Sequence, residues 1–145
     1  MNSKKKKNFL KKLAIIIVFG LNMNITYAQS TTSFDYTNVI NAIGTVESGM
    51  NDNAKNGIHA GFLQISPILV KECNNILKEK GETKRYTNND RYNHQKSIEM
   101  FILIQEKYNP THNVEAMIRL WNGGPGWKKN PSKTNRYYKK VKEKL

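Results

Sequence analysis

The sequence has little cysteine, little histidine and no long apolar run. Cys73 is the only cysteine in 145 residues, so the chain cannot form an internal disulfide. It lies among apolar residues at helical spacing, which indicates a buried thiol rather than a reactive one. The three histidines, His59, His94 and His112, do not show the close spacing of metal ligands. We therefore expect no metal site and no cofactor.

The first apolar stretch, Leu13–Leu21, has only nine residues, too few to span a bilayer as a helix. It follows six lysines and precedes Thr26-Tyr27-Ala28, and this order of basic, apolar and small residues is typical of a secretory signal peptide. We expect residues 1–28 to be removed and residues 29–145 to form one exported domain, periplasmic or secreted. The alternative is an uncleaved membrane anchor.

The rest of the sequence shows mostly helical periodicity, which predicts a mainly α fold. Residues 51–61, rich in Asn, Asp, Ala and Gly, predict a loop that forms a short extended flap and carries Gln64 over a cleft. Asp90 is a candidate helix cap. The expected helices cover Tyr36–Glu47, a segment from Ser66-Pro67 to Gly81, Asn93–Tyr108 as the central core helix, a short helix capped by Asn113, and a basic helix from about Ser132.

One acidic residue, Glu47, is distinguished by its position in the sequence. It is the last residue of the first expected helix and lies beside the apolar stripe of that helix. Desolvation there raises the pKa of a carboxyl group, which can then hold a proton and act as a general acid near neutral pH. A helix-terminal Glu that caps the helix or pairs with a lysine is the alternative. Asp52, in the loop that follows, is interpreted as a turn residue.

A second candidate segment, Trp121-Asn122-Gly123-Gly124-Pro125-Gly126, places backbone amides, an indole and a carboxamide on one tight loop. These are the groups with which proteins bind sugars. Glu47-Ser48-Gly49, Gly61-Phe62-Leu63-Gln64-Ile65 and this loop, in this order and spacing, resemble the catalytic domain of soluble lytic transglycosylases in the goose-type lysozyme-like superfamily. The resemblance covers about residues 39–141. It implies a single small α+β lysozyme-like domain, mainly α, with a substrate cleft.

The resemblance also implies roles for individual residues. Glu47 would be the catalytic acid and base, and Ser48 would support it from the adjoining turn and contact the substrate. Gln64 and Asn122 would hold the sugar. Trp121 replaces the usual Tyr of the family and would keep an aromatic face for a pyranose ring. Lys133 stands where the family often has Glu, so a second carboxylate is not expected there.

The implied activity is cleavage of the MurNAc–GlcNAc β-1,4 bond of peptidoglycan with formation of 1,6-anhydroMurNAc. Most glycoside hydrolases need two carboxylates, and only Glu47 stands near the motifs, which favours this single-acid route. The alternatives are a muramidase of the same fold and a non-catalytic cell-wall-binding or secretion-apparatus accessory protein. Glycan strands are the implied partner, and an envelope-spanning secretion or conjugation machine is left open as a second one.

The formal net charge is +13 and falls to +7 once the six lysines of the expected signal peptide are removed. For an exported protein, this charge favours an association with the acidic cell envelope, although solubility alone would also explain it. No nucleic-acid-binding module is recognisable, and together with the export signal this argues against nucleic acid as a partner. Contact with a membrane is expected only through the signal segment before its cleavage.

Overall fold

Helices make up most of residues 34–145, the part of the chain that this computed structural model describes. The mainly α prediction is thereby confirmed for these residues. The expected signal peptide lies outside them. Within the described range, no helix combines the length and the apolar character that crossing a membrane requires.

Five α-helices and one two-stranded antiparallel sheet form the described part of the chain. In the sheet, Lys55 lies opposite Ala60 and Asn56 lies opposite His59, so the predicted flap is present. The α-helices are α2 (Thr37–Ser48), α3 (Pro67–Glu79), α4 (His94–Tyr108), α5 (Val114–Gly123) and α6 (Asn135–Lys142); the strands are β1 (Lys55–Asn56) and β2 (His59–Ala60); the 3-10 helices are η1 (Asn88–Tyr92), η2 (Trp127–Lys129) and η3 (Pro131–Thr134).

The helix ends follow the capping residues in the sequence. Gly49 ends α2 in the left-handed conformation, with φ 64°. The side chains of Ser66, Asn93 and Asn113 each accept a hydrogen bond from a backbone N–H in the first turn of α3, α4 and α5. The cap predicted at Asp90 is wrong: its carboxylate accepts the backbone N–H of Thr87, 2.6 Å away, and so caps the start of η1 instead of the start of α4.

The last helix also starts later than expected. Residues 131–134 form the 3-10 helix η3, with Pro131 at its first position, and α6 begins only at Asn135. Proline suits the first turn of a helix because it lacks the N–H that would be unsatisfied there.

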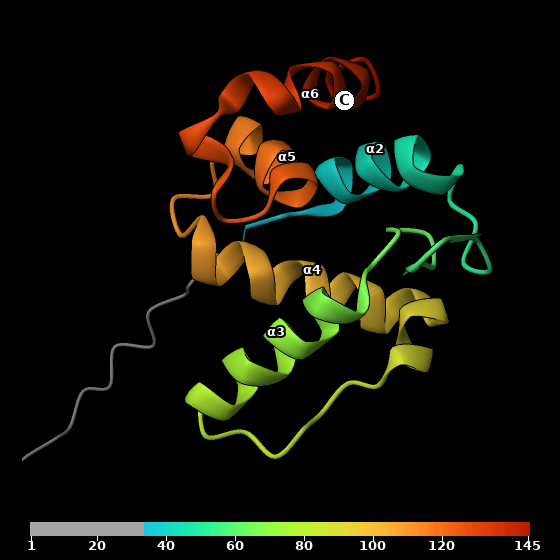
Figure 1. Cartoon of the computed structure of the whole chain (residues 1–145), viewed down its shortest axis with the longest axis vertical. Helices are drawn as coiled ribbons and strands as arrows, with labels where there is room; N and C mark the ends of the chain where they lie inside the picture. The colour runs from blue at the N-terminus through green and yellow to red at the C-terminus, as the bar shows by residue number, and fades with distance from the viewer. Residues whose placement is uncertain (1–33) are drawn as a thin grey trace, which may run out of the picture. The chain divides into compact units, whose positions relative to one another are not determined.

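Helix α4 lies in the middle of the molecule, as predicted (Figure 1). It packs against α3 on one side and α5 on the other, while α2, α5 and α6 pack against one another. Cys73 is fully buried in the core, and burial raises the pKa of its thiol to about 12, as expected for an unreactive cysteine. The largest fully buried side chains include Ile43, Phe62, Leu63, Ile65, Met100, Phe101, Met117, Ile118 and Val141.

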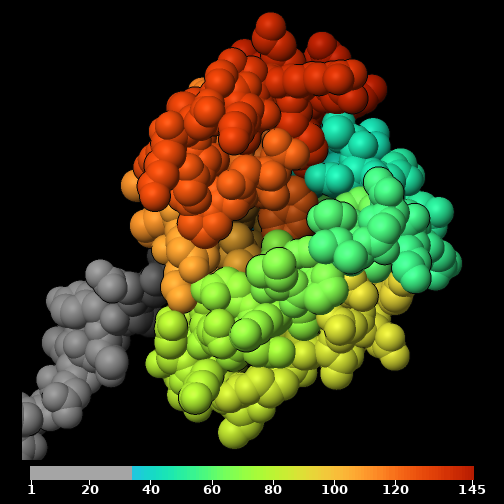
Figure 2. Space-filling model, viewed as in Figure 1, coloured from blue at the N-terminus to red at the C-terminus, as the bar shows by residue number. Residues whose placement is uncertain are grey.

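The surface is hollowed between the C-terminal helices and the segment formed by the flap and the start of α3 (Figure 2). The two walls of this recess therefore come from distant parts of the sequence. One of the two walls includes the start of α3. Its position therefore depends on how α3, and the segment that joins α3 to α4, are held against α4.

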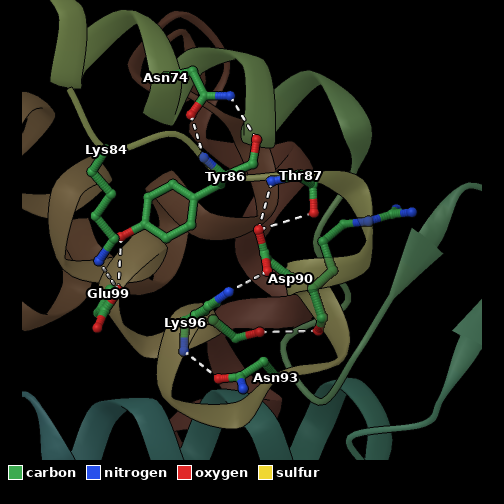
Figure 3. A network of polar contacts seen from close by, with 10 residues as sticks. Asn74, Lys84, Tyr86, Thr87, Asp90, Asn93, Lys96 and Glu99 are labelled. Carbon is green, nitrogen blue, oxygen red and sulfur yellow. Dashed lines mark hydrogen bonds and ion pairs between the residues drawn. The ribbon is translucent and has the colours of Figure 1, made fainter.

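A network of polar contacts fixes that connection (Figure 3). The Asn74 carboxamide pairs with the backbone of Tyr86 in both directions, at 2.9 and 2.7 Å. The Tyr86 hydroxyl donates to Glu99 on α4, and Lys84 donates to the same carboxylate oxygen. The long polar link thus has its own side-chain contacts with both helices that it joins, although it lacks an apolar core of its own.

Gly61 is the residue after β2 that lets the flap pack against η1. Its φ is +77°, and a Cβ atom added there would lie 1.8 Å from the backbone carbonyl oxygen of Arg91. This backbone oxygen cannot move away as the end of a flexible side chain can. Gly57 also has a positive φ, +58°, but no atom lies within 4 Å of its added Cβ.

We expect Gly61→Ala to lower the free energy of unfolding by about 3 kcal/mol or more, because strain and a backbone clash add. Gly57→Ala should cost only the left-handed strain of about 1 kcal/mol. Urea unfolding of the two variants and the parent measures both values. Equal losses would show that the contact with Arg91 is not limiting.

Candidate active site

The hollow contains a cleft of about 310 Å³ between the flap, the start of α3 and the end of α5. Glu47, at the end of α2, lies in its wall, and no other Asp or Glu does. Asn and Gln carboxamides and the Trp121 indole supply most of the remaining surface. The lining residues are Glu47, Asn56, His59, Gln64, Ser66, Leu69, Trp121 and Asn122.

The Glu47 carboxyl group is partly buried where α2 meets α6. The Tyr137 hydroxyl on α6 donates a hydrogen bond of 2.6 Å to Glu47 Oε1. Among residues 34–145, no hydrogen bond or ion pair holds the other carboxyl oxygen, and Glu47 does not pair with a lysine. The alternative of a helix-terminal Glu in a salt bridge is therefore not what the structure shows.

Burial raises the pKa of Glu47 above its ordinary value, as the sequence predicted. The hydrogen bond from Tyr137 and the positive charge of a protonated His59 act in the opposite direction, because both favour the carboxylate. The pKa of Tyr137 is itself raised, first by burial and then by the neighbouring Glu47 charge. The tyrosine therefore stays a donor to the carboxyl group.

Ser48 and Trp121 fasten the Gly61–Ile65 turn from two sides. The Ser48 hydroxyl donates to the carbonyl oxygen of Phe62 at 2.9 Å and accepts the N–H of Asn51 at 3.0 Å. The Trp121 indole N–H donates to the carbonyl oxygen of Leu63 at 3.2 Å. Ser48 does not line the cleft, so the structure supports a positioning role for it rather than the predicted contact with substrate.

Gln64 is held at the tip of this turn with a φ of +50°, which is uncommon for a residue with a side chain. Its Nε2 donates to the carbonyl oxygen of Gly61 at 2.9 Å, and the side chain lines the cleft. Asn122, at the end of α5, is exposed and also lines the cleft. Within residues 34–145 its carboxamide makes no hydrogen bond, so both its donor and acceptor groups are available to a ligand.

Trp121 lines the cleft and a neighbouring cavity of about 420 Å³, toward Tyr108 and Pro125. Its ring packs on Phe101 of the core, with the centroids 4.9 Å apart. The indole is thus fixed by its packing on Phe101 and by its hydrogen bond to the carbonyl oxygen of Leu63. A rigid aromatic surface at this place suits the apolar face of a sugar ring.

Two other carboxylates approach this region but are engaged elsewhere. Asp52 pairs with His94 Nδ1 at 2.8 Å and does not line the cleft, in agreement with its interpretation as a turn residue. Glu72 lines only the neighbouring cavity, where it accepts hydrogen bonds from Tyr108 and Lys107. The hydrogen bond from Tyr108, followed by that from Lys107, lowers the pKa of Glu72, so this group stays ionised.

Sequence reasoning missed Tyr137, His59 and Asn56, and it also did not place Ser66 and Leu69 in the cleft wall. Tyr137 stands 90 positions after Glu47, and only the packing of α6 on α2 brings them together. His59 and Asn56 face each other across the sheet, on the two strands of the flap. Their signal in the sequence was weak, since the flap was predicted only from its polar composition.

Within residues 34–145, no group of three or more His, Cys, Asp or Glu side chains is arranged to hold a metal ion. Comparison of the chain with protein-family models, with curated proteins and with solved structures gave no match. The function must therefore be argued from the site itself.

We expect Tyr137→Phe to raise the pKa of Glu47 further, because it removes a donor that favours the carboxylate while keeping the ring that buries it. Carbon-13 NMR titration of the Glu47 carboxyl carbon measures the shift. Tyr138→Phe is the matched control, since Tyr138 lies next in α6 and its ring packs beneath Arg119, 4.6 Å from the guanidinium carbon. An unchanged pKa of Glu47 in the Tyr137 variant would show that this hydrogen bond does not tune the carboxyl group.

Proposed function

We propose that this chain is a peptidoglycan lytic transglycosylase with a lysozyme-like domain. It would cleave the β-1,4 bond between MurNAc and GlcNAc and close a 1,6-anhydro ring on the MurNAc residue. Export to the periplasm or the cell exterior is part of this proposal, because the substrate lies there. The sequence resemblance and the geometry of the cleft support it independently.

The observation that carries the proposal is the single carboxyl group in the cleft. Hydrolysis of a glycoside usually needs a second carboxylate, either as nucleophile or to activate water. Asp52 is paired with His94, and Glu72 lies in the adjoining cavity with two donors on it. A reaction in which one residue serves first as acid and then as base fits this arrangement better than hydrolysis does.

In the first step, Glu47 in its protonated form would give its proton to the glycosidic oxygen as the bond to C1 breaks. The carbonyl oxygen of the substrate's own 2-acetamido group would bond to C1 and take up the positive charge as an oxazolinium ion. Burial favours the protonated starting state of Glu47. The hydrogen bond from Tyr137 then stabilises the carboxylate that remains.

In the second step, the Glu47 carboxylate would take the proton of the C6 hydroxyl on the same MurNAc residue. The C6 oxygen would attack C1, and the bond from C1 to the acetamido oxygen would break. Glu47 recovers its proton, and no water is consumed. An intramolecular hydroxyl competes well with water because its effective concentration at C1 far exceeds that of a loosely held molecule.

The direct test is the structure of the products from purified sacculi. We expect the mature protein to release muropeptides that end in 1,6-anhydroMurNAc and have no reducing end, and Glu47→Gln to release none. Mass spectrometry distinguishes them from hydrolysis products, which are heavier by one water. Mainly reducing-end muropeptides would establish a muramidase instead, and no release by the folded parent would favour a non-catalytic wall-binding protein.

Loss of activity in Glu47→Gln should not reflect unfolding. Because the pKa of Glu47 is raised in the folded state, its contribution to stability is fully present below its unfolded pKa, near 4.5, and is lost as pH rises through the folded value. Glutamine removes this loss and keeps an oxygen for Tyr137. Thermal unfolding should therefore show the variant close to the parent at acid pH and equal or more stable at neutral pH.

The two carboxamides of the cleft should contribute through binding of the sugar. We expect Gln64→Ala and Asn122→Ala each to cost about 1 to 3 kcal/mol of transition-state stabilisation, measured from kcat/KM on soluble glycan fragments. Asn38→Ala is the control, because Asn38 is exposed on α2 and does not line the cleft. A loss in the control as large as in the site variants would remove the assigned roles.

A further inference from the structure

Another cavity, of about 450 Å³, adjoins the cleft at Glu47. Glu47 and Asn122 line both spaces, so the two lie next to each other at these residues. The two spaces differ in charge: the cleft presents carboxamides and an indole, whereas this cavity presents basic side chains. It is lined by Val46, Glu47, Asn122, Lys133, Arg136, Tyr137 and Lys140.

The three cations of this cavity, Lys133, Arg136 and Lys140, follow one another at intervals of three and four residues. This spacing places them on one face of the η3–α6 segment, where consecutive turns bring them side by side. All three are exposed, and none forms an ion pair within residues 34–145. Other exposed lysines are also unpaired there, but these three differ because they line a cavity that shares Glu47 and Asn122 with the cleft.

Elsewhere in the described chain, acidic groups neutralise the lysines that lie near α4. Lys80, Lys84, Lys96 and Lys107 each have a carboxylate within 3.1 Å. In the basic cavity the only acidic side chain is Glu47, whose Oε1 is bound by Tyr137 and whose protonated form carries no charge. The cavity therefore has three positive charges beside the bond that the proposed reaction would break.

We propose that this basic cavity binds a carboxylate carried by the glycan strand next to the cleaved bond. The inference rests on the proposed function, which places a glycan across Glu47 and so brings the adjoining sugar into the cavity. Each MurNAc residue bears a lactyl group that ends either in a carboxylate or in a peptide stem with carboxylates of its own. Long lysine and arginine side chains around an open cavity suit such a group, whose position varies with the stem.

The test measures binding rather than turnover, in the Glu47→Gln protein. The ligands are wall glycan fragments, freed of other wall polymers, in two forms: with free carboxylates, and with the same carboxylates converted to neutral amides by a carbodiimide and ammonia. Lys133→Gln, Arg136→Gln and Lys140→Gln are combined in one variant. The control combines Lys129→Gln, Lys139→Gln and Lys144→Gln, which remove the same charge from exposed residues that do not line the cavity.

Isothermal titration should show that the Glu47→Gln protein binds the carboxylated form about tenfold more tightly than the amidated one, as three exposed charges can supply. The cavity variant should bring this ratio close to one, whereas the charge-matched control should keep it. Added salt should weaken the preference, because exposed charges are screened. A ratio that the cavity variant leaves unchanged, or that the control removes equally, would overturn the inference.

Two further experiments are needed. One identifies which carboxylate of the glycan strand is bound, and the other tests the proposed function apart from this inference. Fragments stripped of their stems by an amidase keep only the lactyl carboxylate, so a retained preference assigns it to the lactyl group and a lost one assigns it to the stem. Turnover of sacculi by the parent protein tests the proposed function separately. Anhydro products without any carboxylate preference in binding would overturn this inference alone, whereas release of mainly reducing-end muropeptides would overturn the proposed function.

Discussion

The contact between Glu47 and Tyr137 is the interaction on which the candidate site depends. A carboxyl group at the end of an apolar helix loses hydration, and the 2.6 Å hydrogen bond from α6 replaces part of what water would supply. That bond forms only if α6 packs on α2, which Val141 secures as a fully buried residue of the core. The C-terminal helix is therefore part of the candidate site, although no site role was predicted for Tyr137.

The opposite wall is built by a turn that two side chains hold to the helices. Ser48 binds the turn at Phe62 from the end of α2, and Trp121 binds it at Leu63 from the end of α5. Phe62 and Leu63 are fully buried, so the turn is also anchored in the core. Gln64 is left in the left-handed conformation at the tip, where its side chain faces the cleft. The backbone strain is sustained because the residues on either side are fixed.

The parts of the fold that could be predicted are those that local chemistry determines. Periodicity and capping residues located the five helices, and Ser66 and Asn113 marked the starts of two of them. The raised pKa of Glu47 also followed from a local feature, its place beside an apolar stripe. The error at Asp90 has a local cause as well: a carboxylate near a helix start can bond backward to Thr87 as readily as forward, and the sequence pattern does not distinguish the two.

The contacts that join distant segments were beyond such reasoning. Tyr137 reaches Glu47, and the Trp121 indole reaches Leu63, only through the packing of helices against one another. The sequence could indicate that Lys133, Arg136 and Lys140 share a face, but not that this face borders the cleft. For the same reason Ser48 was expected to contact substrate, whereas its hydroxyl is used by the turn.

These long-range contacts have opposing effects on the pKa of one carboxyl group, that of Glu47. Burial alone would favour the protonated form of Glu47, whereas the proposed reaction also needs its carboxylate. Tyr137 and a protonated His59 favour the ionised form from two different elements, α6 and the flap. A group that gives up a proton and recovers it within one reaction needs both states to be accessible at the working pH. The structure assembles the three residues from separate segments, and in the proposed reaction they would serve without a second carboxylate.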